Sequence, residues 1–96
     1  MANRTALFIP LRTEHYKAFA SGAKDTELRV YGPRWNESTC YLGRPVVLSC
    51  GYGKQHRLQG RIVQFCVSTM ATQTAEWQDC YGTTEGLAAC IGIELD

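Results

Sequence analysis

The sequence lacks any apolar run close to the roughly 20 residues that a membrane-spanning helix requires. Its first segment, MANRTALFIPLRTEHY, lacks the long apolar stretch and the small-residue cleavage site of a secretion signal. From these two absences we expect a cytoplasmic protein with no membrane partner.

Closely spaced cysteines are also missing, and with them the ligand pairs that are typical of a zinc site. The five cysteines are Cys40, Cys50, Cys66, Cys80 and Cys90. Three of them lie in the apolar runs VVLSC, FCV and AACIGI, which predicts buried free thiols. We therefore expect no metal and no cofactor, while a nucleophilic cysteine paired with His15 or His56 stays open as an alternative.

A strong excess of either charge is absent too, since ten Lys and Arg residues oppose nine Asp and Glu residues. The net charge of +1 is not typical of a protein that coats duplex DNA. The distribution is nevertheless uneven, because residues 44–61 contain no acidic residue. In this segment the residues expected to contact a nucleic-acid backbone are Arg44, Lys54, His56, Arg57 and Arg61. The alternative for the glycine-punctuated part, GYGKQHR, is a solvated hairpin tip.

What is present is the composition of one folded domain over residues 1–96, with 45% hydrophobic and 20% charged residues. The patterns predict strands over 5–11, 25–31, 45–50, 61–67 and the C-terminal run LAACIGIELD, and short helices over 12–22 and 74–82. Short strands with glycine-rich turns favour a mixed α+β, mainly β fold, namely a small curled sheet or β-barrel of about five to six strands with two short helices.

Side-chain spacing predicts which faces meet the core. In the first helix, Tyr16, Phe19 and Ala20 share one face, between an N-cap at Thr13 and a terminating Gly22. In the strand RIVQFCV, alternation separates Val63, Phe65 and Val67 from Ile62, Gln64 and Cys66. In the last strand, the odd-numbered residues of 89–95 form the core face.

The stretch DTELRVY, residues 25–31, places charged side chains in a row. Successive residues of a strand face opposite sides of the sheet. One face therefore carries Asp25, Glu27, Arg29 and Tyr31. We expect Leu28 and Val30, on the other face, to hold the strand against the core. The charged row is then either a solvated sheet face or the wall of a pocket.

Lys24, Glu27 and Arg29 together suit a polar, planar ligand and are the candidate catalytic residues. Arginine offers a rigid fork of donors for a carbonyl or phosphate, and lysine stabilises developing negative charge. Glutamate accepts from an amino group, or acts as a general base if its pKa is raised. The simpler alternative is an exposed ion pair between Glu27 and Arg29, whose side chains start about 7 Å apart on one strand.

Three further residues follow closely and are candidates for ligand binding. Tyr31, Arg34 and Trp35 combine aromatic rings with a guanidinium, as stacking on a nucleobase requires. Trp35 is equally compatible with a place in the core or at its rim.

The stretch FIPLRTEHYKAFASGAKDTELRVYGPRW resembles the start of an ASCH domain, a small β-barrel of the PUA-like group. The hallmark of that family is a strand, a short helix and then G-x-K-x-x-E-x-R, which Gly22, Lys24, Glu27 and Arg29 match position by position. The later segments GRPVVLSCGYGKQHRLQGRIV and ACIGIEL resemble the strands that complete the barrel, so the resemblance covers nearly the whole chain.

This resemblance implies a PUA-like barrel that binds RNA or a modified nucleoside or nucleotide, with the motif residues lining a pocket. Some family members remove the acyl group from N4-acetylcytidine, and others are reported as ribonucleases. In the amidohydrolase branch a nucleophilic threonine stands three residues after the motif lysine, where this chain has Glu27. The covalent mechanism therefore does not transfer, and whether the protein is an enzyme stays open.

Three hypotheses follow from the sequence. The first is a module that binds RNA or a modified nucleoside. The second is a hydrolase acting on RNA or N4-acylated cytidines, with Glu27 and Lys24 as general base and electrostatic stabiliser. The third is a small phage or bacterial accessory protein that binds a host factor or a nucleotide signal.

Overall fold

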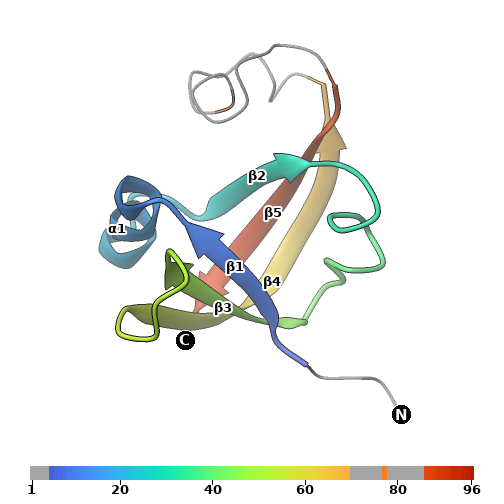
Figure 1. The fold of residues 1–96 in the computed structure, drawn as a ribbon. Helices are drawn as coiled ribbons and strands as arrows, with labels where there is room; N and C mark the ends of the chain where they lie inside the picture. The colour runs from blue at the N-terminus through green and yellow to red at the C-terminus, as the bar shows by residue number, and fades with distance from the viewer. Residues whose placement is uncertain (1–4, 70–76, 78–85) are drawn as a thin grey trace.

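A computed structural model describes residues 5–69, Trp77 and residues 86–96, and shows a mainly β fold with one sheet (Figure 1). The elements are β1 (Leu7–Leu11), α1 (Thr13–Ser21), β2 (Thr26–Val30), β3 (Pro45–Cys50), β4 (Arg57–Ser68) and β5 (Ala88–Leu95). The predicted fold class is confirmed. The second helix predicted over 74–82 lies outside the described residues, except for Trp77, whose side chain is buried.

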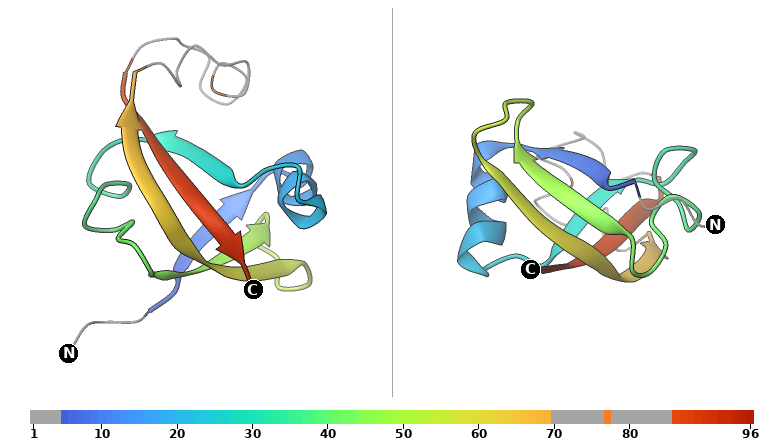
Figure 2. Two further views of the ribbon diagram at one scale, coloured as in Figure 1. Left: turned by 180° about the vertical axis from the view of Figure 1, so that it is seen from behind. Right: turned by 90° about the horizontal axis from the view of Figure 1, so that it is seen from below.

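The five strands form one curled sheet in the order β1-β3-β4-β5-β2 (Figure 2). β1 and β3 are parallel, and the other neighbouring strands are antiparallel. The long strand β4 makes the curl possible, because Arg57–Arg61 pair with β3 while Gly60–Ser68 pair with β5. Residues 57–60, which precede the strand predicted over 61–67, therefore belong to β4, and the turn is confined to residues 51–56.

The helix α1 is nine residues long and packs by a narrow apolar face. Phe19 is buried and Tyr16 packs against the core, but Ala20 is exposed, so the predicted face was one residue too wide. The N-cap is Arg12 rather than Thr13. Gly22 ends the helix as predicted, at φ 83°, a left-handed conformation that glycine adopts without a steric penalty.

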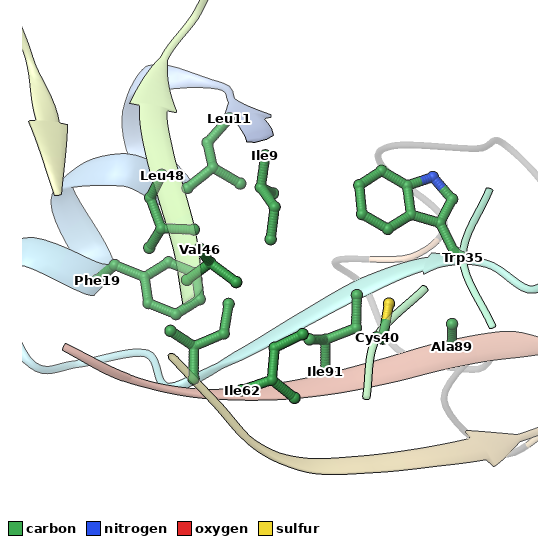
Figure 3. Packing of buried hydrophobic residues seen from close by; sticks show 11 residues of the cluster. Ile9, Leu11, Phe19, Trp35, Cys40, Val46, Leu48, Ile62, Ala89 and Ile91 are labelled. Atoms are coloured by element: carbon green, nitrogen blue, oxygen red, sulfur yellow. The ribbon is translucent and has the colours of Figure 1, made fainter. Parts of the chain in front are cut away.

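The core lies inside the curl of the sheet and is closed at one end by α1 (Figure 3). Its largest fully buried residues in the sheet are Ile9, Val46, Leu48, Ile62 and Ile91. The prediction for the last strand is confirmed, because Ala89, Ile91 and Ile93 are buried and Leu95 packs against them. Trp35 and Cys40, from the loop between β2 and β3, cover the end away from α1.

The predicted alternation in β4 is wrong because the strand contains a bulge. Ile62 pairs with Ile93 and is buried, but the register shifts between Ile62 and Gln64. A bulge adds one residue to a strand and so exchanges the faces on either side of it. Phe65 consequently packs on the same core as Ile62, and Val63 is exposed.

The orientation predicted for the apolar residues of β2 is also wrong. Glu27 is buried, whereas Leu28 is only partly buried and Val30 is 47% exposed. β2 is an edge strand, and its inner face is the one that carries Glu27, Arg29 and Tyr31. The charged face of this strand therefore points into the curl.

Gly60 is the residue at which β4 passes from one neighbour to the other, and it has no room for a side chain. A Cβ at this position would meet the carbonyl oxygen of Glu94 and lie 3.0 Å from the Cα of Leu95. We expect Gly60→Ala to lower the free energy of unfolding by about 1–3 kcal/mol, measured by urea denaturation. Gly53→Ala is the control, because a Cβ there has no heavy atom within 4 Å. Equal stability of the two variants would show that β5 does not approach β4 this closely.

Candidate functional site

The site is built around the buried carboxylate of Glu27. Its Oε1 lies 3.1 Å from Lys24 Nζ and its Oε2 lies 2.8 Å from Arg29 Nε. The three side chains are 8–17% exposed. A carboxylate buried to this extent is tolerated when it is paired and hydrogen-bonded. We call Lys24, Glu27 and Arg29 the ion triplet, and their predicted proximity is confirmed.

The ion triplet is tied to β1 and α1. Arg29 Nη2 donates to the carbonyl oxygen of Pro10 over 2.6 Å, and thereby joins the two edge strands of the sheet. Lys24 Nζ lies 3.1 Å from Nδ1 of His15. Because an ammonium can only donate, Nδ1 accepts in this contact, which leaves the proton of a neutral imidazole on Nε2.

Aromatic rings flank both cations. Lys24 Nζ is 5.6 Å from the centre of the Phe19 ring, and the Arg29 guanidinium is 4.9 Å from that of Trp35. These distances are within the range of cation–π attraction. Both cations are therefore held between Glu27 and the apolar core.

Two adjoining cavities open beside the ion triplet. The Glu27 cavity, about 200 Å³, is lined by Pro10, Leu11, Arg12, His15, Glu27, Leu28 and Arg29. The Tyr52 cavity, about 380 Å³, is lined by Pro10, Leu11, Arg12, Arg29, Gly51 and Tyr52. The two share four lining residues. Together they reach the size of ordinary small-ligand sites, which span roughly 300–1,000 Å³.

The chemistry available in the Glu27 cavity is mainly that of hydrogen-bond donors. Both oxygens of Glu27 already face a cation, so the carboxylate serves to anchor Lys24 and Arg29. Arginine only donates hydrogen bonds, and the Nε2–H of a neutral histidine is a donor as well. Such a lining suits a ligand rich in carbonyl or phosphate oxygens.

The three predicted ligand-binding residues lie away from these cavities. Trp35 is buried in the core, the alternative that the sequence left open, with the Arg29 and Arg34 guanidinium groups 4.9 and 5.5 Å from its ring centre. The Tyr31 hydroxyl donates to the carboxylate of Glu37, with oxygen–oxygen distances of 2.7 and 3.0 Å. None of the three lines the Glu27 or the Tyr52 cavity.

The five residues predicted to contact a nucleic-acid backbone lie in three separate parts of the structure. Arg44 donates to the carbonyl oxygens of Thr5 and Thr39 and fastens two chain segments together. Arg61 is exposed and pairs with Glu94 across β4 and β5 at 3.3 Å. Lys54 and His56 lie in the hairpin between β3 and β4, which also carries Tyr52, and Arg57 is the first residue of β4; none of the three lines the Tyr52 cavity.

The cysteines are less buried than predicted. Of the described ones, Cys40 is buried, Cys50 and Cys90 are partly buried and Cys66 is exposed, while Cys80 lies outside the described residues. Burial, together with the neighbouring Cys66 thiol, raises the pKa of Cys90 to about 11. Residues 5–69, 77 and 86–96 contain no group of three side chains that could hold a metal ion. Within the same residues no helix is long and apolar enough to cross a membrane.

The sequence did not assign Pro10, Arg12, His15 or Tyr52 to the ligand site, although all four line one or both cavities. Pro10 and Arg12 flank the end of β1, and His15 lies in the first turn of α1. The available signal was the short connection from β1 to α1, which keeps these residues together. Tyr52 lies in the hairpin after β3, far along the chain from β1. No local sequence pattern connects it to the G-x-K-x-x-E-x-R motif.

Comparison with known proteins adds no family to this description. No family model matches the chain, and no curated protein matches it. The resemblance to ASCH domains therefore stays an expectation from the sequence.

The ion triplet predicts a clear difference between two ion pairs of the sheet. Glu27→Gln should lower the free energy of unfolding by about 3 kcal/mol, because it leaves two largely buried cations without their anion. Glu94→Gln is the matched control, since the Arg61–Glu94 pair is about 60% exposed and should contribute less than about 1 kcal/mol. Urea denaturation of both variants measures the difference. Equal costs would contradict the role of Glu27 as an anchor.

The contact between Tyr31 and Glu37 predicts a pH dependence. The hydrogen bond to Glu37 raises the pKa of Tyr31, and the same bond lowers the pKa of Glu37. The contact therefore stabilises the fold at pH values between the pKa of Glu37 and the pKa of Tyr31. Its contribution is lost as the pH rises through the raised pKa of Tyr31, or falls through the lowered pKa of Glu37.

Ultraviolet titration of the tyrosines tests this contact. The difference between the protein and its Tyr31→Phe variant isolates the phenol of Tyr31. In a Glu37→Gln background the pKa of that phenol should fall, and an unchanged pKa would show that the contact does not form in solution.

Proposed function

We propose that this protein binds RNA or a modified nucleoside, with one base entering the Glu27 cavity. The observation that carries the proposal is the ion triplet, which fixes two cations against a carboxylate beside a cavity of about 200 Å³. The resemblance of G-x-K-x-x-E-x-R to the ASCH motif points to the same ligand class.

Closing the sheet does not by itself require charged side chains. Apolar residues of similar volume often stabilise a protein as much as a buried ion pair, or more, because the charges of the pair lose their hydration on burial. Of the two cations only Arg29 lines the Glu27 cavity, and a rigid cation there has a use in recognition, since it is oriented before the ligand arrives. A preorganised site loses less entropy when it binds.

The donor-rich lining supports a nucleobase or nucleotide over an apolar ligand. Bases of single-stranded RNA are recognised by hydrogen bonds to their polar edges, and a guanidinium is well suited to a carbonyl or phosphate oxygen. The apolar surfaces of Leu11 and Leu28, which line the same cavity, suit the faces of a planar ring.

Binding is favoured over hydrolysis by the state of Glu27. A general base needs an oxygen that can take a proton from water. Here Oε1 and Oε2 lie 3.1 and 2.8 Å from cationic nitrogens, so each oxygen already accepts a charged contact and has only its remaining lone pair for water. Under the third hypothesis, in which the protein binds a host factor or a nucleotide signal, a nucleotide would occupy the same cavity.

Isothermal titration calorimetry with the four ribonucleosides and N4-acetylcytidine tests the proposal. We expect at least one of these probes to bind, and Arg29→Lys to weaken that binding by roughly tenfold or more, because the forked donor is lost while the charge remains. Arg61→Lys is the matched control, since Arg61 is exposed on the outer face and lines neither cavity.

Two results would contradict the proposal. The first is that none of the nucleosides, and no single-stranded RNA, binds the folded protein. The second is conversion of a probe to a new product, detected by mass spectrometry and lost in Arg29→Lys, which would replace a binding function with catalysis.

A further inference from the structure

We infer that the site continues onto the hairpin between β3 and β4, where Tyr52 stacks a second base, so that the ligand is single-stranded RNA of at least two nucleotides. This inference rests on the proposed function and adds to it the length of the ligand and its charged backbone. It follows from the exposure of Tyr52, the rigidity of its hairpin and the continuity of the two cavities.

Tyr52 is a large aromatic residue that the fold leaves open. Its side chain is 82% exposed, the highest exposure among the large hydrophobic residues that the structure describes. Its ring centre is 6.1 Å from that of Phe8 in β1, with the rings inclined at 37°. The Arg57 guanidinium lies 5.2 Å from the centre of the Phe8 ring. Phe8 thus supports Tyr52 from β1 and leaves much of its surface accessible to a base.

Three hydrogen bonds fasten the hairpin that carries Tyr52 to the sheet. The buried hydroxyl of Ser49 donates to the carbonyl oxygen of Gly53 over 3.1 Å, and Arg57 Nε donates to the same oxygen over 3.2 Å. The backbone N–H of Gly51 donates to the carbonyl oxygen of Leu11 over 2.9 Å. Tyr52 is therefore presented on a fixed turn, as a stacking platform requires.

The position of the hairpin connects Tyr52 to the ion triplet. Leu11, which receives the bond from Gly51, lines both cavities, as do Pro10, Arg12 and Arg29. A ligand with one base in the Glu27 cavity can therefore extend into the Tyr52 cavity along a shared wall. A lone nucleoside with its base in the Glu27 cavity would not extend along this wall as a longer strand does.

The charge of the hairpin fits a ligand with a phosphodiester backbone. Residues 51–57 carry Lys54, His56 and Arg57 and no acidic residue. Lysine and arginine next to an exposed aromatic ring are the combination used by proteins that bind single strands, in which bases stack and phosphates meet cations. An apolar partner would gain little from these cations.

The test compares a short ligand with a longer one. The protein is titrated with the four ribonucleosides, N4-acetylcytidine and a single-stranded ribohexamer of random sequence. We expect the hexamer to bind at least about tenfold more tightly than the best nucleoside. Tyr52→Ala should weaken hexamer binding by roughly 5- to 100-fold while nucleoside binding changes by less than about twofold. Tyr52→Phe, which retains the ring, should bind the hexamer as the unchanged protein does.

Salt dependence provides a second measurement. Each phosphate neutralised on a single strand should contribute about 0.7 to the slope of log Kd against log salt concentration. We expect a positive slope for the hexamer that decreases in Lys54→Gln, and almost none for the nucleosides.

The outcomes separate this inference from the proposed function. If a nucleoside binds and depends on Arg29, but the hexamer binds no more tightly or Tyr52→Ala has no effect, the inference is wrong and the proposed function stands. If neither nucleosides nor the hexamer bind, the proposed function is wrong and the inference falls with it.

Discussion

The fold of this protein depends on a contact between the two edges of its sheet. The sheet curls until β1 and β2 approach each other, yet among the described residues no ladder of backbone hydrogen bonds joins them. Arg29 spans the remaining space, because its Nε holds the carboxylate of Glu27 and its Nη2 reaches the carbonyl oxygen of Pro10. Pro10 has no backbone N–H, which is compatible with an unpaired strand edge. A side chain thus performs the closure that backbone pairing would perform in a complete barrel.

This manner of closure places charged groups where a complete barrel would have only backbone and apolar side chains. A continuous ladder between β1 and β2 would occupy the space that the Glu27 cavity now takes. The cations and the carboxylate lose their hydration when they are buried. The ion pairs between them and the contacts with the neighbouring aromatic rings offset that cost. The feature that leaves the sheet open is therefore the same feature that gives the molecule a polar cavity.

The proposed binding surface combines segments that lie far apart in the sequence. The ion triplet belongs to β2 and the segment before it, Arg12 and His15 belong to the start of α1, and Tyr52 belongs to the hairpin after β3. Hydrogen bonds from Gly51 to Leu11 and from Ser49 to Gly53 hold these segments in one arrangement. The proposed ligand, a short single strand of RNA, would touch all of them.

Local patterns in the sequence determined the fold class, the positions of the strands and α1, the core face of β5 and the grouping of Lys24, Glu27 and Arg29. Each of these depends on residues within a few positions of one another, through alternation in a strand, periodicity in a helix or a glycine at a helix end. Only the tertiary structure decided that Val30 is half-exposed while Glu27 is buried, that a bulge exchanges the faces of β4, and that Tyr52 adjoins the ion triplet. The physical reason is that alternation gives two faces without saying which one meets the core. That choice depends on the curl of the whole sheet and on the partners that the curl brings to each face.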